Sequence, residues 1–267
     1  MPVAVTYCPL CNTAVSFRRP VIDRAATTFG TSGKLYKSNL VMYDRATGSL
    51  WPQALGIAVT GELTGRRLER VATQIVSFAD FRAAFPGGRV LSRHTGFDRP
   101  YGQNPYPLYD AEGAEPFLFK GRTDERLPAV ARILGLSEGG QHLAVPYTRL
   151  AAQANGGVAA VNLELAGAPL LVIWRSGATS ALDRESIAAS RNVGAAAGFS
   201  RRANGRALTF HTSAGQLTDI QTASTWGPFG RAVGGPLAGA RLAPATAMDS
   251  FWFDWAAVHP DTAIWGG

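Results

Sequence analysis

Two stretches in different halves of this 267-residue chain share one pattern of aspartate, tryptophan, glycine and leucine. The first, MYDRATGSLWPQALGIAVTGELTGRRL, covers 42–68, and the second, LTDIQTASTWGPFGRAVGGPLAGARL, covers 217–242. Because a pattern repeated over this length marks one structural unit used twice, we expect two copies of a β-rich unit packed with pseudo-two-fold symmetry. The matched pairs are Asp44 and Asp219, Trp51 and Trp226, Gly56 and Gly230, Ala58 and Ala232, Gly61 and Gly235, Leu63 and Leu237, Gly65 and Gly239, and Leu68 and Leu242.

The match continues on both sides of this pattern. ADFRAAFPGGRV (79–90) aligns with FDWAAVHPDTAI (253–264), and PVAVTYCPLCNTAVSFRR (2–19) aligns with PLLVIWRSGATSALDR (169–184). Features present in both copies are expected to be architectural: the paired aspartates should begin turns and the paired tryptophans should fill the core. Features present in one copy only are freer to be functional.

The first unit is expected to lack its front part. We place it over 1–118, with the CPLC motif and a linker loop, and a cysteine-free second unit over 119–267. The second unit opens with HLAVPYTRLAAQANGGVAAVNLELAGAPLLVIW (142–174), whose counterpart would precede Pro2. Counting from Lys120, about 48 residues are missing, so we expect a truncated sequence or a unit that has lost these strands. A first unit with no exposed sheet edge would contradict this expectation.

Turn residues and short apolar runs predict a mainly β fold with a few short helices. The chain has 30 glycines and 16 prolines between short runs rich in valine, isoleucine and aromatic residues, which is typical of strands separated by turns. PVAVTY and TAVSF are expected to form strands around the CPLC turn, and NLVMYD a hairpin with SLWPQ. SFADFRAAFPG, MDSFWFDWAAVHP and DERLPAVARILGL have helical spacing, and Ser77 is expected to cap the first of these helices. The stretch 92–113 is expected to be a long ordered loop or an active-site cover.

The charge distribution argues against a nucleic-acid partner, and the apolar pattern leaves the cellular location of the protein open. The formal net charge is +7, but the arginines are scattered and form no basic tail or recognition helix, so no nucleic-acid binding is predicted. No apolar run is long enough to span a membrane. The N-terminal residues show no charged region followed by a cleavage site, so localisation is unknown from the chain itself.

The only two cysteines, Cys8 and Cys11, occur in one copy of the unit and are our candidate catalytic and metal-ligating residues. Cys-Pro-x-Cys between two strands is typical of metal knuckles, in which backbone N–H groups point at the thiolates. Thiolate ligands favour zinc, iron or copper(I) as the cofactor. Four ligands are usual and there is no second Cys-x-x-Cys, so others must come from a histidine, an aspartate, a second subunit or a missing N-terminus. His94 is the best candidate.

Two other roles for the CPLC motif stay open. Cys-Pro-x-Cys is also the pattern of thiol–disulfide centres, although the strand expected after Cys11 offers no helix N-terminus to activate the first thiol. The third role is structural, as a disulfide or as two small buried side chains. A disulfide across so short a loop would gain little stability from loop entropy.

Polar residues of the first copy are candidate pocket residues, unless they simply face water. Arg99, Tyr101, Tyr106 and Tyr109 lie with His94 in or beside the aromatic loop, and could form a lid over the CPLC turn or pack the seam between the units. The partner implied is a small molecule or a peptide. The candidates near the mouth of the expected sheet are Ser32, Tyr36, Lys37 and Asn39.

Four stretches, VAVTYCPLCNTAVSF, LVMYDRATGSLW, HTGFDRPYGQNPYPLY and GGPLAGARL with FWFDWAAVHPDT, together resemble the uncharacterised prokaryotic domain-of-unknown-function family 3179. The resemblance covers essentially the whole chain, and the family has no established activity to carry over. It implies a protein that is exported or membrane-associated, and therefore an extracytoplasmic location. It also implies an N-terminal part that ends in a Trp-His-Glu-like stretch and a GG-PVAVTYCPLC lead-in, which could associate with a membrane and supply a ligand such as histidine.

Together these patterns predict a metal-binding site centred on Cys8 and Cys11, which could serve a metal-dependent enzyme. One alternative is a thiol–disulfide oxidoreductase that uses the CPLC pair. Another is a non-catalytic binding module whose cleft takes a peptide or a glycan.

Overall fold

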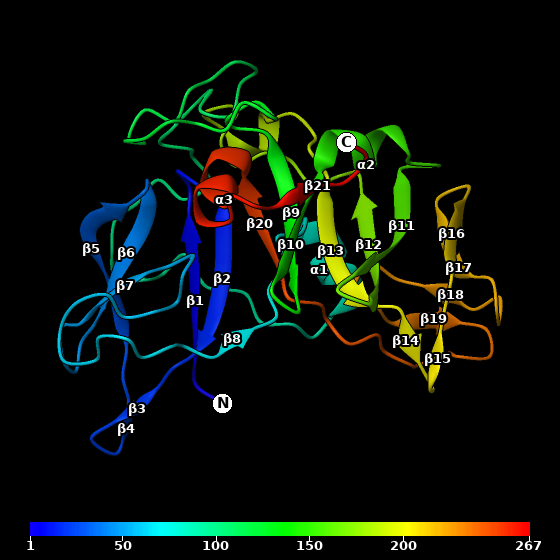
Figure 1. The fold of residues 1–267 in the computed structure, drawn as a ribbon, viewed down its shortest axis with the longest axis horizontal. Coiled ribbons are helices and arrows are strands. Elements are labelled where there is room, and N and C mark those ends of the chain that lie inside the picture. The colour runs from blue at the N-terminus through cyan, green and yellow to red at the C-terminus, as the bar shows by residue number, and fades with distance from the viewer.

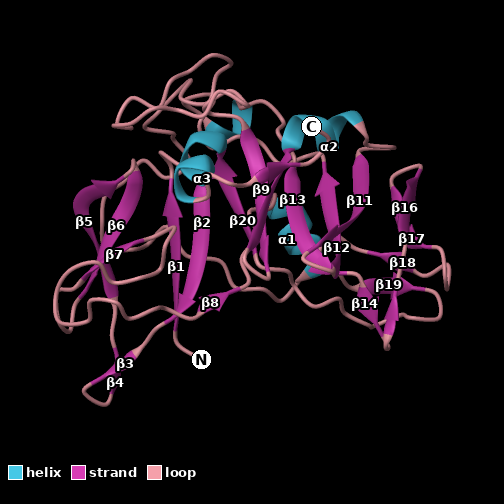
Figure 2. Ribbon diagram, viewed as in Figure 1, coloured by secondary structure: helices cyan, strands magenta, loops and turns pink.

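The computed structural model describes residues 1–267, and the fold is mainly β with three short helices, as predicted (Figure 2). The strands are β1 Val3–Cys8, β2 Thr13–Arg18, β3 Val21–Ile22, β4 Ala25–Ala26, β5 Phe29–Tyr36, β6 Asn39–Asp44, β7 Leu50–Pro52, β8 Arg70–Val71, β9 Arg132–Glu138, β10 Gln141–Pro146, β11 Val158–Leu165, β12 Ala168–Arg175, β13 Ala195–Ser200, β14 Arg202–Ala203, β15 Arg206–Ala207, β16 Phe210–Ser213, β17 Gln216–Asp219, β18 Thr225–Trp226, β19 Ala232–Gly234, β20 Ala247–Phe251 and β21 Ala263–Ile264. The helices are α1 Phe78–Ala84, α2 Tyr147–Ala152 and α3 Trp252–Val258, with a 3₁₀ turn at Ile187–Ala189.

The strands form several small sheets that stand side by side (Figure 1). Strands β1 to β8 lie on the left of the view, β11 to β19 on the right, and β9, β10 and β20 between them. The middle sheet has the order β20-β9-β10-β21, so strands from the middle and the end of the chain pair directly. One core cluster spans this junction, because Phe17 and Trp51 of the first part pack with Trp252 and Trp255 of the last.

Most of the expected strands and two of the expected helices are confirmed. β1 and β2 pair as an antiparallel hairpin around the CPLC turn, and β6 pairs with β7. The helix α1 begins after Ser77, whose side chain accepts a hydrogen bond from the backbone N–H of Asp80, which is the expected N-cap. No helix or strand occurs within 92–113, as predicted for the long loop.

The prediction of a helix over DERLPAVARILGL is wrong. Pro128 interrupts this stretch and the chain continues as strand β9, which pairs with β10 on one side and β20 on the other. The strand is buried on both faces, so its apolar residues need not alternate with polar ones. The ring of Trp255 packs directly against the backbone of Gly135. This packing requires glycine, because a Cβ at this position would clash with the ring.

The two matched stretches have the same local hydrogen bonding. Asp44 accepts a hydrogen bond from the indole N–H of Trp51 at 3.0 Å, and Asp219 accepts one from Trp226 at the same distance. Each aspartate also accepts from the backbone N–H three residues later at 2.7 Å. Burial acts to raise the pKa of both carboxyls, but these donors hold each pKa below its usual range, so both aspartates stay ionised and fix their turns.

The glycines that follow also play the same part in both stretches. Gly56 and Gly230 adopt left-handed φ angles of 64° and 65°, a region that favours glycine. A Cβ at Gly56 would lie 2.8 Å from the ring of Phe17, and one at Gly230 would lie 2.6 Å from that of Phe199. That the units as wholes, over 1–118 and 119–267, are copies related by a pseudo-two-fold axis stays a prediction.

Candidate functional site

The two thiols lie at the end of β1 and in the turn that follows it. Cys8 is the last residue of β1, and Cys11 lies two residues before Thr13, the first residue of β2. Thr13 pairs with Cys8 across the hairpin. Asn12 has a left-handed φ of 51° and turns the chain back into β2. Both cysteines are free thiols, exposed by only 2% and 0% of their surfaces. The site is therefore a reduced, buried pair between two strands.

The surroundings shift the two thiol pKa values in opposite directions. A hydrogen bond from the Cys11 thiol is the largest cause that lowers the pKa of Cys8, and it outweighs the burial that raises it. Backbone N–H groups of Leu40 and Cys11 lower the pKa of Cys8 further. Burial raises the pKa of Cys11 well above its usual range. Cys8 is thus the group that becomes a thiolate first, while Cys11 keeps its proton.

A buried carboxyl, that of Asp254 on α3, lies beside Cys11. Burial raises its pKa to about 6, while interactions with Cys11, Ser250 and Thr13 work in the opposite direction. Its Oδ2 atom accepts hydrogen bonds from the hydroxyls of Thr13 and Ser250, each at 3.3 Å. Its other oxygen, Oδ1, has no hydrogen-bond partner. Because this carboxyl titrates near neutrality next to a protonated thiol, it can accept and return a proton.

The start and the end of the chain are joined at this site. The backbone N–H of Phe251 donates to the carbonyl of Cys11 at 2.8 Å, and the hydroxyls of Thr13 and Ser250 lie 3.4 Å apart. Phe251 and Phe253 pack in the same apolar cluster as the two thiols. The end of β20 and the start of α3 therefore hold the CPLC turn in place and form one wall of the site.

Two segments cover the thiols. The first is the β5–β6 turn, where Lys37 and Ser38 have left-handed φ angles of 51° and 68°. The carbonyl of Ser38 lies 3.9 Å from the Cys8 sulfur, and the Lys37 ammonium donates to the carbonyl of Ala257 at 2.7 Å. This hydrogen bond ties the turn to the end of α3. A surface cavity of about 600 Å³ adjoins it, lined by residues that include Lys37 and Phe253.

The second cover is the long loop between α1 and β9. The hydroxyl of Tyr109 donates to the carbonyl of Leu10 inside the CPLC turn at 3.0 Å. The ring of Tyr106 lies 6.3 Å from that of Tyr109, and both rings belong to the cluster around the thiols. Burial raises the pKa of Tyr109, so its hydroxyl stays protonated and can keep this hydrogen bond.

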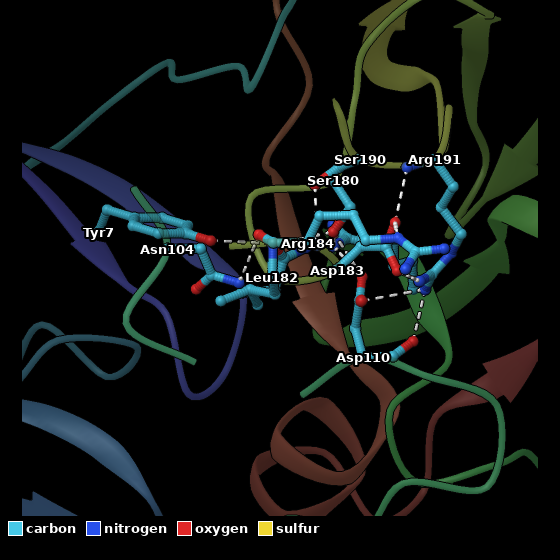
Figure 3. Close-up of polar contacts among 11 residues, drawn as sticks. Tyr7, Asn104, Asp110, Ser180, Leu182, Asp183, Arg184, Ser190 and Arg191 are labelled. Atoms are coloured by element: carbon cyan, nitrogen blue, oxygen red, sulfur yellow. Dashed lines mark hydrogen bonds and ion pairs between the residues drawn. The ribbon is translucent and has the colours of Figure 1, made fainter. Parts of the chain in front are cut away.

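A buried ion network anchors this loop to the rest of the molecule. Asp110, next to Tyr109, is paired with Arg132 of β9 at 2.5 Å and with Arg191 at 3.1 Å. Arg191 also pairs with Asp183 at 3.0 Å, and the hydroxyl of Ser180 donates to Asp110 at 2.7 Å. Figure 3 shows the carboxylates of Asp110 and Asp183 both facing the Arg191 guanidinium. The loop that covers the thiols is thus fixed through Asp110 and Arg132, which are shielded from water, and through Arg191, which is partly exposed.

Comparison with known proteins places the chain in a family. A family model described as "Protein of unknown function (DUF3179)" matches residues 1–262. The chain belongs to the DUF3179 family. No curated protein and no solved structure gives a significant match. The match to the family model confirms the resemblance drawn from the CPLC and MYDRATGSLW stretches. None of the helices of the DUF3179 chain has the length and apolar character needed to cross a membrane.

The structure of the DUF3179 chain brings some predicted site residues together and separates others. Asn39 is buried and its side chain forms a hydrogen bond with Cys11 that lowers the pKa of that thiol. Lys37 and Tyr106 belong to the covers already described. Ser32 donates to the carbonyl of Val41 within the β5–β6 hairpin at 2.6 Å. The remaining candidates are exposed, whereas both thiols are buried: Tyr36, His94, Arg99 and Tyr101.

The metal site stays a prediction. No group of three or more histidine, cysteine, aspartate or glutamate residues in the DUF3179 chain is arranged to hold a metal ion. His94, the expected third ligand, lies on the exposed part of the long loop, where its backbone N–H bonds to Ser92.

Sequence reasoning missed Asp254 because its match in the first copy, Asp80, marked it as architectural. In α1, Ser77 caps the helix and its hydroxyl donates to Asp80 at 2.8 Å. In α3 the residue at the capping position is Phe251, which cannot make this bond. The loss of the capping serine was the one signal in the DUF3179 sequence that Asp254 has another partner.

Proposed function

We propose that this chain is a thiol–disulfide oxidoreductase whose reactive dithiol is Cys8 and Cys11. The observation that carries the proposal is the asymmetry of the site: the Cys8 pKa is lowered, the Cys11 pKa is raised, and Asp254 lies beside Cys11. A nucleophilic thiol, a second thiol that resolves the intermediate and a nearby proton acceptor are the groups that disulfide exchange needs. The substrate class is a small or peptide-borne disulfide.

In the first step the Cys8 thiolate attacks one sulfur of the substrate disulfide. A bond forms between Cys8 and that sulfur, the substrate S–S bond breaks, and the other substrate sulfur leaves as a thiolate. Hydrogen bonds from the Cys11 thiol and from backbone N–H groups stabilise the Cys8 thiolate before attack. They replace the helix N-terminus, which β2 does not provide here.

In the second step Cys11 attacks the sulfur of Cys8. The Cys11 thiol gives its proton to the Asp254 carboxylate, the new bond joins Cys8 and Cys11, and the remaining substrate sulfur leaves as a thiolate. The substrate disulfide gains two electrons and the dithiol loses them, so the exchange balances. Asp254 suits this role because its pKa of about 6 leaves it mostly ionised at neutral pH.

Access to Cys8 is expected to depend on the Lys37 turn. A Lys37→Met variant loses the hydrogen bond to Ala257 and should react about tenfold faster with a soluble thiol reagent, because local opening controls the reactivity of a buried group. The measurement is the second-order rate of thiol labelling in native protein. Lys34→Met is the matched control, since its exposed ammonium makes no hydrogen bond. Equal rates for wild type and Lys37→Met would place the opening at the Tyr109 loop instead.

Trapping of the mixed disulfide tests the proposal directly. A Cys11→Ser variant, treated with an aromatic disulfide that releases a coloured thiolate, should release about one equivalent and keep the other half on Cys8. Wild type should release about two equivalents and end with a Cys8–Cys11 disulfide, seen by mass spectrometry as the loss of two hydrogens. Cys8→Ser should react slowly.

Two results would contradict the proposal. One is the same slow reaction for wild type, Cys8→Ser and Cys11→Ser after the thiols are shown to be reduced. The other is near-stoichiometric zinc, iron or copper in anaerobically purified protein that disappears in a Cys8→Ser/Cys11→Ser double variant. That second result would favour the metal site.

A further inference from the structure

β1 has an unpaired edge. It lies at the end of its sheet and pairs only with β2. The backbone N–H of Arg19 donates to the carbonyl of Pro2 at 3.0 Å, and antiparallel pairs alternate between bonded and non-bonded positions. Ala4, Thr6 and Cys8 therefore bond to β2, while the backbone N–H and C=O groups of Val3, Val5 and Tyr7 face outward. Val5 is 78% exposed.

The counterpart of β1 in the second half of the chain has no free edge. Aligned through Pro2 and Pro169, β1 corresponds to β12, and the hydrogen bond from Arg201 to Pro169 at 2.9 Å reproduces the one from Arg19 to Pro2. The sequence alignment of 2–19 with 169–184 thus holds for β1 but not for β2, because 176–184 contain no strand and β13 pairs with β12 instead. The outward edge of β12 is filled by β11, which runs antiparallel to it. Val172, which corresponds to Val5, is fully buried, in a core cluster that includes Leu136 and Leu150.

A groove occupies the place that β11 has in the second half. A cavity of about 390 Å³ lies between β1 and the β5–β6 hairpin. In the second half β11 lies between β12 and β16, because the amide of Asn162 bonds both the N–H and the C=O of Phe210. Phe29 corresponds to Phe210, since each faces the matched aspartate across its hairpin and packs edge-on against the matched tryptophan. Its N–H points away from β6 and into the groove.

The charge of the groove matches the groove-facing side of β11. Arg19 is the one charged residue in the lining, and its Nε atom has no hydrogen-bond partner. Ala160, Asn162 and Glu164 alternate along β11 and so share the face that Asn162 turns toward β16. Glu164 pairs with Pro169, the counterpart of Pro2, whose carbonyl accepts a hydrogen bond from the backbone N–H of Arg19. A strand seated like β11 would bring an acidic side chain to the end of the groove where Arg19 lies.

We propose that this groove binds an extended segment of a partner polypeptide, which adds a strand antiparallel to β1. The segment carries a small residue, an amide and an acid at alternate positions, in the pattern Ala-x-Asn-x-Glu. Its backbone pairs with Val3, Val5 and Tyr7, which gives affinity, while the amide meets Phe29 and the acid meets Arg19, which gives specificity. The site is thus an interaction surface for an unstructured peptide segment.

The probe is a synthetic peptide, Gly-Val-Thr-Ala-Thr-Asn-Thr-Glu-Leu-Ala, which follows 157–166. It keeps Ala160, Asn162 and Glu164 and replaces three residues of the opposite face with threonine, namely Ala159, Val161 and Leu163. Saturating peptide should slow amide hydrogen exchange at Val5 and Tyr7 at least about tenfold. The same peptide with asparagine changed to leucine and glutamate to glutamine should bind at least about tenfold more weakly.

Two variants of the full chain provide the matched test. Val5→Pro removes an outward N–H and leaves the β1–β2 bonds intact, as proline does on edge strands, and Val5→Lys places a charge on the same edge. Both should abolish peptide binding, whereas Val5→Thr should retain it. An unchanged near-ultraviolet circular dichroism spectrum shows that each variant is folded. Binding is read without thiol chemistry, so this result is independent of the proposed function.

Two outcomes would overturn the proposal. Equal binding of the peptide to wild type, Val5→Pro and Val5→Lys would place it elsewhere. A wild-type dimer in sedimentation that Val5→Pro converts to monomer, with no peptide binding, would show that a second copy of this chain occupies the edge.

Discussion

An Asp254→Asn variant is expected to resolve the mixed disulfide on Cys8 about 100-fold more slowly than wild type, while the first exchange step stays nearly unchanged. The reason is that Asp254 lies beside Cys11 and helps to raise the pKa of that thiol, whereas it is the last of the causes that act on the pKa of Cys8, which it also raises. Stopped-flow kinetics with a coloured disulfide separate the two steps, because each releases one thiolate. Asp80→Asn, at the matched position of α1, should leave both rates unchanged.

The pH dependence gives a second readout of the same group. The wild-type second step should rise with pH through about 6, the pKa of Asp254, and then level off, because only the carboxylate accepts the proton. In the Asp254→Asn variant the rate of the second step should not rise near pH 6. A variant that slows both steps equally, or keeps the rise near pH 6, would contradict the role of Asp254.

The slower second step expected for Asp254→Asn is not explained by a loss of stability. The folded pKa of Asp254, about 6, lies above its ordinary value of 3.8, so the folded state binds this proton more tightly than the unfolded state. Its stabilising contribution is fully present below about pH 3.8 and is lost as pH rises through about 6. Asparagine carries no charge to bury, so the variant should be no less stable than wild type at pH 7.

An Asp110→Ala variant is expected to lose about 3–5 kcal/mol of unfolding free energy, because removing one partner of a buried ion pair leaves an uncompensated charge. Here that charge is Arg132, whose side chain is 11% exposed. Urea unfolding followed by tryptophan fluorescence gives the value. The same variant frees the loop that carries Tyr109, so Cys8 should become more reactive toward thiol reagents.

Two further variants check this explanation. Asp98→Ala removes an exposed carboxylate of the same loop that has no ion pair, and it should change stability by less than about 0.5 kcal/mol. Asp110→Ala/Arg132→Met should recover part of the loss, because the orphaned charge is gone. A loss of less than about 1 kcal/mol in Asp110→Ala would mean that the network contributes no more than an exposed ion pair.

The sequence predicted elements whose pattern is local. The alternation in β1 and β2, the turn aspartates and the Ser77 cap depend on neighbours within a few residues, and the structure has them where expected. β9 was mistaken for a helix because a strand buried on both faces shows no alternation, and its two neighbours come from 141–146 and 247–251.

The site was predicted only in part, for a related reason. Cys8, Cys11 and Asn39 stood out because the second copy lacks them. Asp254 acts through contacts made across nearly the whole chain, which no local pattern records, and Asp110 is fixed by arginines far from it in sequence. Some functional residues belong to no spaced motif and do not differ from their match in the other copy. These residues can be identified only once the packing is known.

The contact between Thr13 and Asp254 joins residues 241 positions apart. The wall formed by Phe251 and Phe253 therefore leaves the ribosome well after the CPLC turn that it covers. Until those residues emerge and pair, Cys8 and Cys11 remain open to any oxidant or thiol in the surrounding compartment. During synthesis this protein thus passes through a stage in which its two thiols are unprotected, and the redox conditions of that stage decide in which state the pair is sealed.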